Sequence, residues 1–177
     1  MAYTASHRPQ GWRDVTLTEA HDEVLTLMTQ RGFGRQDRKG REIVQNAFRM
    51  ASVKHMPTVD DLAHSFYVGR KSLGRMCHKR LMPTPRRILA FARILNVTVH
   101  YIPGGTSRDA CAAVGYDENA FSKAVHRHTG LRPTVLRSAG GGWIRLTQAW
   151  MEAETSAGRA SFTEPWRAQC PACGSVL

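Results

Sequence analysis

Two stretches of this sequence share one layout, and that layout constrains the fold more than any other feature. Residues 58–80 and 106–128 each begin with a short capped apolar helix, pass through a turn that contains glycine, and end in a helix that carries cations. A connector of 25 residues, itself containing a helix, separates them. Each copy fits a helix-turn-helix, and the repeated layout indicates a weak internal duplication.

The rest of the chain also reads as helices, because apolar residues recur every three or four positions between turn signals. A capping box at 16–19 opens one helix, and a basic helix is predicted at roughly 38–54. Thr84-Pro85 starts a helix that runs through 84–101, and a short helix is predicted at 143–154. Because no strand pattern is present, the sequence predicts an all-α fold with about eight helices.

The positive charge is concentrated in one block. The 177 residues carry 25 Lys and Arg against 14 Asp and Glu, a net charge of +11. Residues 38–137 hold 18 of these cations and six of the anions, a net charge of +12, so the remainder of the chain has a net charge of −1. A basic chain points to nucleic acid or an anionic membrane. The alternative, a solvated basic surface without a role, would spread the charge more evenly.

Several other classes of protein do not fit the sequence. No apolar run is long enough for a transmembrane helix and no signal peptide precedes the helices, so we expect a cytoplasmic protein without a membrane partner. Four cysteines do not form a disulfide framework, and Cys77 and Cys111 are expected to be buried apolar residues. No phosphate loop, nucleophile elbow or pair of catalytic carboxylates is found, so we do not expect an enzyme.

The cationic helices have the composition that a DNA-reading helix needs. The second helix of a helix-turn-helix lies in the major groove, where Arg, Lys, Asn, Gln and Ser match the donors and acceptors of the base edges. For either stripe alone, the alternative is an ordinary solvated helix face. The presence of two such stripes within the charged block favours DNA binding. The outward stripes hold Arg70, Lys71, Gly74, Arg75, His78 and Lys79 in the first helix, and Glu118, Asn119, Lys123, His126 and Arg127 in the second.

Residues 38–137 resemble the DNA-binding domain of the AraC/XylS family of bacterial transcription regulators. The stretch 112–133 carries most of the resemblance, with a Gly-aromatic turn, a helix containing Phe-Ser-Lys, and Gly-x-x-Pro, followed by Arg137. The first half of the block matches the family pattern at Leu62-Ala63, Leu73-Gly-Arg75, Pro85 and the linker-helix arginine Arg93.

The resemblance implies two helix-turn-helix subdomains joined by a linker helix, so that one chain reads two successive major-groove segments of double-stranded DNA. The first unit is then 38–82, the linker helix is 84–101 and the second unit is 104–137. Residues 1–37 and 138–177 would be short helical extensions, too small for the sensor domain that most family members carry. The protein would then either work as a stand-alone DNA-binding module or receive its signal from a partner. Its partners besides double-stranded DNA would be RNA polymerase or another protein, and the protein would be a monomer or a dimer.

By position, the resemblance assigns base-reading sites to Lys71, Gly74 and Arg75 in the first helix and to Asn119 and Lys123 in the second. The whole set of expected DNA contacts on the two cationic helices is Arg70, Lys71, Ser72, Gly74, Arg75, Lys79, Asn119, Ser122, Lys123, His126 and Arg127. Gly74 departs from the pattern, because the family usually has a polar reader there. Cys77, Val125 and Thr129 replace common aromatic core residues, so a looser or repacked core is expected. His126 and His128 are expected to face phosphate or solvent.

The C-terminal stretch leaves several alternatives open. Cys170 and Cys173 form half of a zinc knuckle, and two chains together could supply four thiolates to one ion. A redox pair and a tail without a role are the other interpretations. With Cys170 and Cys173 reactive or zinc-binding, the chain would instead be a DNA-repair or metal- or redox-responsive protein that uses the helices for targeting. Trp143 and Trp150 are predicted to pack rather than to stack on bases, and their helix could also bind a partner protein.

Overall fold

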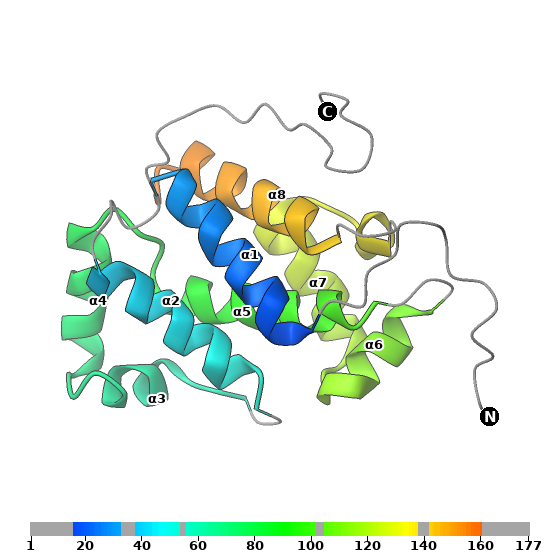
Figure 1. The fold of residues 1–177 in the computed structure, drawn as a ribbon, viewed down its shortest axis with the longest axis horizontal. Helices are drawn as coiled ribbons and strands as arrows, with labels where there is room; N and C mark the ends of the chain where they lie inside the picture. The colour runs from blue at the N-terminus through cyan, green and yellow to red at the C-terminus, as the bar shows by residue number, and fades with distance from the viewer. Residues whose placement is uncertain (1–15, 33–37, 54–55, 102–104, 138–141, 161–177) are drawn as a thin grey trace.

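The computed structural model describes residues 16–32, 38–53, 56–101, 105–137 and 142–160. Over these ranges the chain forms eight α-helices, one short 3-10 helix and no strand, which confirms the all-α prediction (Figure 1). The elements are α1 (Leu17–Gln30), α2 (Arg38–Ala51), α3 (Val59–His64), α4 (Arg70–Lys79), α5 (Pro85–Val99), α6 (Ser107–Val114), α7 (Glu118–Thr129), the 3-10 helix η1 (Pro133–Arg137) and α8 (Gly142–Ser156).

Local sequence signals set many of the helix ends. At α3 the Thr58 hydroxyl accepts the amide of Asp61 at 3.2 Å, and the Asp61 carboxylate accepts the amide of Thr58 at 2.6 Å. The same reciprocal capping box opens α1 and α6. Pro85 occupies the first position of α5. Gly115 and Gly130 end α6 and α7 in the left-handed conformation that favours glycine.

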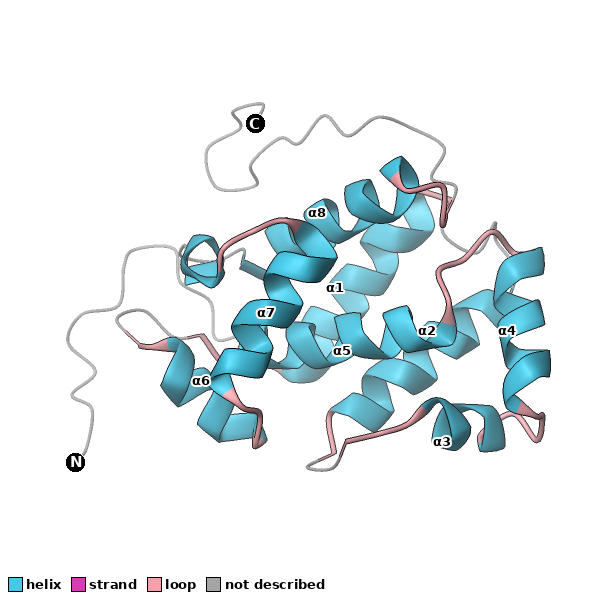
Figure 2. Cartoon of the chain, turned by 180° about the vertical axis from the view of Figure 1, so that it is seen from behind, coloured by secondary structure: helices cyan, strands magenta, loops and turns pink. Residues whose placement is uncertain are grey.

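α5 is the central helix of the fold, and α1 to α4 and α6 to α8 all pack against it (Figures 1 and 2). Its buried side chains point in several directions and include Ile88, Phe91, Ile94 and Leu95. A helix that is apolar on nearly all sides is one that the fold encloses. The predicted linker is therefore also the core around which the other helices are arranged.

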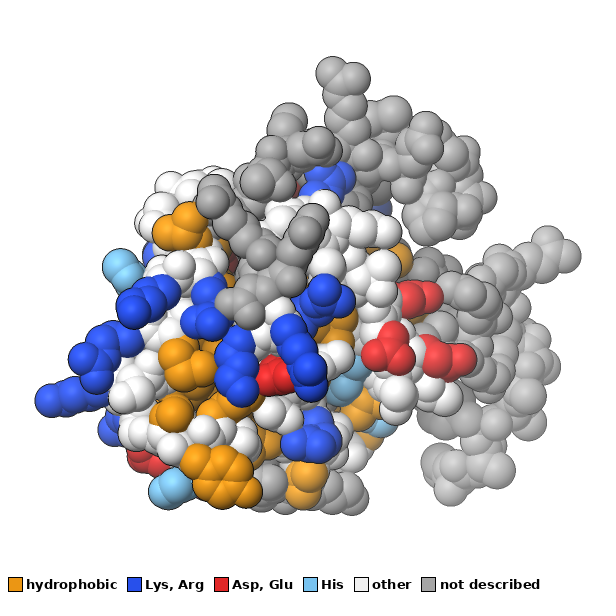
Figure 3. Space-filling model, turned by 60° about the vertical axis from the view of Figure 1, so that its left-hand side comes forward, with side chains coloured by type: hydrophobic (Ala, Val, Ile, Leu, Met, Phe, Trp, Pro, Cys, Tyr) orange, Lys and Arg blue, Asp and Glu red, His pale blue; other side chains and the backbone are white. Residues whose placement is uncertain are grey.

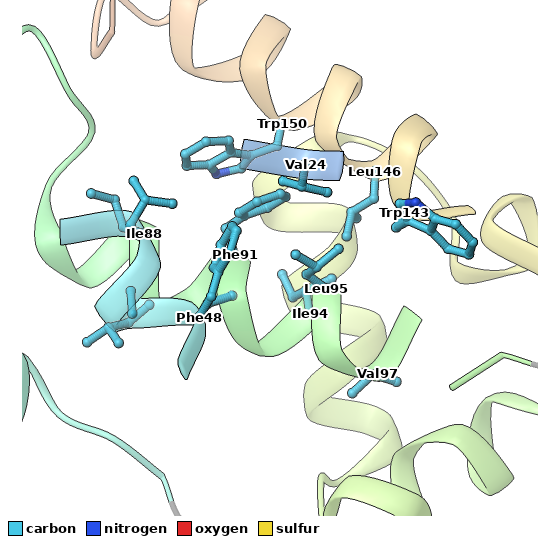
Figure 4. Packing of buried hydrophobic residues seen from close by; sticks show 14 of the residues in the cluster. Val24, Phe48, Ile88, Phe91, Ile94, Leu95, Val97, Trp143, Leu146 and Trp150 are labelled. Carbon is cyan, nitrogen blue, oxygen red and sulfur yellow. The ribbon is translucent and has the colours of Figure 1, made fainter. Parts of the chain in front are cut away.

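α1 and α8, which lie outside residues 38–137, belong to the same hydrophobic core (Figure 4). Trp150 of α8 is fully buried and stacks on Phe91 of α5, with ring centroids 4.3 Å apart. Trp143 donates from its indole nitrogen to Glu23 of α1 at 3.0 Å. The burial of both tryptophans confirms that they pack inside the protein. The sequence pattern had placed these helices in extensions, whereas they complete the core.

Candidate nucleic-acid interface

A tight turn joins α3 to α4 and sets the angle between them. After α3 ends, the amide of Tyr67 donates to the carbonyl of His64 at 2.9 Å, and the amide of Val68 donates to that of Ala63 at 3.2 Å. α4 then buries Leu73 and Cys77. Because those two side chains lie on one side of the helix, the opposite side of α4 faces outward.

The outward side of α4 carries the residues predicted to bind DNA in the first unit. Arg70, Lys71, Arg75 and Lys79 are exposed, whereas Ser72 and Gly74 are half-buried. Nη2 of Arg75 lies 3.5 Å from the hydroxyl of Ser72. Arg70 forms an exposed ion pair with Asp60 of α3, with 2.8 Å between nitrogen and oxygen. The structure therefore leaves four cations of α4 accessible to a large anion.

The N-terminus of α2 adds cations that the sequence interpretation did not single out. Arg38 and Lys39 are exposed, and both pair with Glu42, at 2.9 Å and 3.3 Å. Hydrogen bonds from Arg38 and then Lys39 lower the pKa of Glu42. Lys39 also lies 5.5 Å from the ring centroid of Phe66, beside the turn before α4. Figure 3 shows Lys and Arg side chains gathered over the end of the molecule that α4 occupies.

The second unit is built in the same way. Asp117 caps α7 by accepting the amide of Ala120 at 2.7 Å. The Ser107 hydroxyl at the start of α6 donates to Glu118 at the start of α7, over 2.7 Å. Arg108 also approaches Glu118, at 3.5 Å. Although Glu118 was placed in the outward stripe, it is half-buried and joins the two helices.

The outward side of α7 carries the predicted contacts of the second unit. Asn119, Lys123, His126 and Arg127 are exposed, and Ser122 is half-buried. Their spacing of four, seven and eight residues from Asn119 puts the four exposed side chains on one face. The buried side of α7 is formed by Phe121, Val125 and Thr129.

The two exposed faces repeat in register. Lys71, Arg75, His78 and Lys79 of α4 correspond, at a constant offset of 48 residues, to Asn119, Lys123, His126 and Arg127 of α7. The same offset relates Thr58 to Thr106, Asp61 to Asp109, Leu73 to Phe121 and Cys77 to Val125. Capping residues, buried residues and exposed polar residues therefore recur together, as a duplicated unit requires.

The structure does not bring the two faces into one cluster. α4 and α7 lie toward opposite ends of α5 (Figure 2). Between them, Arg93 of α5 donates to the carbonyl of Pro57, which precedes α3. Burial raises the pKa of Tyr116, in the turn before α7, and the charge of Arg93 acts against that increase. Arg93 thus binds the residue that precedes α3, and its charge acts on the turn before α7.

His128 lies in a different place from the one predicted for it. Its imidazole is half-buried, and burial lowers its pKa to about 4, with a further lowering by the charge of Arg87. Among the described residues, Nδ1 of His128 has no hydrogen-bond partner. The prediction that this histidine faces phosphate or solvent is wrong, because it lies on the side of α7 that packs toward α5 and α8.

The cysteines divide into two groups. Cys77 and Cys111 are buried, as predicted, and burial raises the pKa of each thiol to about 11. Cys170 and Cys173 lie outside the described residues, so their zinc or redox role stays a prediction. In the ranges that the structure describes, no three His, Cys, Asp or Glu side chains come together in a way that could hold a metal ion.

Two further results bear on function. No helix in the described part of the chain combines the length and the apolar character needed to cross a membrane. Comparison with family models, curated proteins and solved structures finds no match to this chain. The two polar faces and the charge around them are therefore the features of the described structure that indicate a function.

Proposed function

We propose that this protein binds double-stranded DNA sequence-specifically and regulates transcription, with α4 and α7 as its two recognition helices. One observation carries the proposal. A short capped helix, a tight turn and a helix with an exposed polar and cationic face follow one another twice, in the same register and toward opposite ends of α5. Each α3–α4 or α6–α7 pair would then be one helix-turn-helix.

The side chains on these faces have the chemistry of base recognition. Arg and Lys donate to the O6 and N7 acceptors of guanine, and Asn pairs with adenine through one donor and one acceptor. Lys71 lies in the N-terminal half of α4 and Arg75 just past its middle, and Asn119 and Lys123 lie in the N-terminal half of α7. That half of a recognition helix is the one that contacts base edges.

The length of α5 supports the reading of two neighbouring grooves. A helix of 15 residues is about 22 Å long, and one turn of DNA is about 34 Å. The recognition helices lie toward the two ends of α5, so the width of a helix adds to this length. The resulting separation of α4 and α7 is of the same order as one turn of DNA. Arg93, anchored on Pro57 near Tyr116, would keep that separation fixed.

Phosphate contacts would supply most of the affinity. Arg38 and Lys39 of α2, together with Arg70 and Lys79 of α4, would neutralise phosphates and release counterions, so binding should weaken steeply with salt. The resemblance to the AraC/XylS family over residues 38–137 supports the same reading. The protein would act by binding rather than by catalysis, on the bacterial nucleoid in the cytoplasm.

Selection of bound duplexes from a random DNA pool tests the proposal directly. We expect an enriched motif with two half-elements about 10 base pairs apart, because the two helices would lie about one turn apart. Pools that enrich no motif would show that the protein does not read sequence. Binding that is equal for every duplex and lost at moderate salt would show non-specific attraction to phosphate alone.

Substitutions then assign each half-element to a helix. Arg75→Ala and Lys123→Ala should each weaken binding to the selected site by about 1–3 kcal/mol. Arg75→Ala should relax selection at one half-element only, and Lys123→Ala at the other, so each variant is the matched control of its partner. Unchanged affinity of both variants would remove these side chains from the reading surface.

A further inference from the structure

Tyr67, in the turn between α3 and α4, combines an unusual backbone conformation with nearly complete exposure. Its φ is +53°, in the left-handed region that a large side chain rarely occupies. The residue is 98% exposed, the highest value among the exposed large hydrophobic residues of the described ranges. The residue was not among the DNA contacts expected from the sequence.

The second unit shows which residue this backbone position favours. At the offset of 48 residues Tyr67 corresponds to Gly115, which has a φ of +69°. The hydrogen bonds match as well: Val68 donates to Ala63 in the first unit, and Tyr116 donates to Cys111 in the second. Both turns are the helix-ending motif in which glycine is common at the left-handed position. The first unit has tyrosine where its own repeat has glycine.

Nothing inside the described structure offsets the cost of this choice. A strained side chain is usually held by burial against its neighbours, and Tyr67 is almost entirely in solvent. Backbone outliers of this kind are concentrated at functional sites, where the strain is retained for a contact that it makes possible. Of the two non-glycine residues with a left-handed backbone in the described ranges, Tyr67 and Leu81, only Tyr67 is almost fully exposed and precedes α4, so its compensating contact is expected outside this chain.

We propose that Tyr67 contacts the sugar-phosphate backbone of DNA beside the recognition helix α4. The turn presents it two residues before Gly69, the N-cap of α4, and next to the exposed cations Arg70 and Lys71. A tyrosine hydroxyl donates to phosphate oxygens, and such contacts fix the register of a protein on the duplex. The inference rests on the proposed function and adds to it an anchor that the second unit lacks, since Gly115 has no side chain.

The test compares Tyr67→Gly and Tyr67→Phe with the unmodified chain. Tyr67→Gly relieves the left-handed conformation, so its folding stability should equal or exceed that of the unmodified chain in urea unfolding. Its affinity for the selected duplex should nevertheless fall about tenfold. Tyr67→Phe keeps the ring without the hydroxyl, so an affinity near that of Tyr67→Gly assigns the contact to the hydroxyl, and an affinity near the unmodified value assigns it to the ring.

Leu81 provides the matched control. It has a φ of +52°, is also exposed, and follows the opposite end of α4. Leu81→Gly should therefore relieve the same kind of strain without changing DNA affinity, because the apolar side chain of Leu81 has no donor for a phosphate oxygen. Equal losses of affinity in Leu81→Gly and Tyr67→Gly would overturn the inference, since the loss would then come from the backbone change.

The two proposals fail in distinguishable ways. If the unmodified chain selects a DNA motif and Tyr67→Gly binds it equally well, the role of Tyr67 is overturned and the proposed function stands. If the unmodified chain selects no motif, the proposed function fails, and the role of Tyr67 fails with it.

Discussion

Arg87 of α5 donates from Nε to the carboxylate of Glu154 in α8 over 2.5 Å, and that carboxylate is completely buried. Arg159, just beyond α8, donates to the other oxygen at 3.0 Å. Amide groups of residues 159 and 160 close the end of the helix on the Glu154 carbonyl. This network ties the C-terminal end of α8 to the central helix.

Removing the charge of Glu154 should destabilise the fold. In Glu154→Gln, Arg87, whose side chain is only 21% exposed, loses its anionic partner, and a buried pair that loses one member costs about 3 kcal/mol. The free energy of unfolding in urea, compared with that of the unmodified chain, measures the effect.

Asp60→Asn is the control for this substitution, because it breaks the Arg70–Asp60 pair, whose side chains are both largely exposed. Exposed pairs contribute little, so the change should stay within about 1 kcal/mol. Equal losses in the two variants would show that the Glu154 network does not depend on burial.

Trp150→Ala should be among the most destabilising single substitutions in the chain. The indole is fully buried and stacks on Phe91, with 16° between the ring planes. Truncating a buried tryptophan costs about 3–5 kcal/mol through lost contacts and the cavity left behind. Glu152→Ala, on the exposed side of the same helix, should change stability by no more than about 0.5 kcal/mol. A small loss in Trp150→Ala would mean that α8 is not part of the core.

Two glycine substitutions should act in opposite directions. A Cβ added at Gly74, inside α4, meets no atom within 4 Å, so Gly74→Ala should stabilise the protein by about 1 kcal/mol through helix propensity. At Gly142, the first residue of α8, the added Cβ would lie 2.1 Å from the carbonyl oxygen of Leu136, so Gly142→Ala should destabilise. Thermal unfolding of both variants checks the pair, and a stabilised Gly142→Ala would contradict the packing of α8 on η1.

Features encoded locally were predictable from the sequence. The pairs Thr58–Asp61 and Thr106–Asp109 fixed the starts of the two short helices, because a capping box needs only residues three apart. The exposed stripes of α4 and α7 followed from spacing alone, except that Gly74 and Glu118 are half-buried. The positions of Tyr67 and Gly115 could also have been matched by aligning the two repeats, but no propensity predicts a tyrosine in the left-handed region.

Features that depend on contacts distant in sequence were not predictable. Glu154 reads as an ordinary helix-surface carboxylate, and only the tertiary fold places it beside Arg87, 67 residues away. The stacking of Trp150 on Phe91 and the burial of His128 have the same origin, because periodicity shows which side of a helix is apolar and not which helix covers it. This is why α1 and α8 read as extensions of a block whose core they complete.

Protonation of His128 should destabilise the protein in mild acid. Burial, and next the charge of Arg87, lower its folded-state pKa to about 4, with Arg127 and Arg159 acting in the same direction and Glu154 against them. In the unfolded chain a histidine has a pKa of about 6.5, so between these values the unfolded state binds a proton that the folded state does not. Stability is therefore complete above about pH 6.5 and is lost as the pH falls toward 4.

The loss should amount to about 1–2 kcal/mol, after allowance for the partial exposure of the imidazole to solvent. Burial also lowers the pKa values of His21 and His100, which adds to the effect in the same direction. His128→Gln removes one titrating group, so urea unfolding between pH 7 and pH 4 should show a shallower decline than in the unmodified chain. Parallel curves for His128→Gln and the unmodified chain would show that the packing of α7 against α5 and α8 does not exclude the charged imidazole.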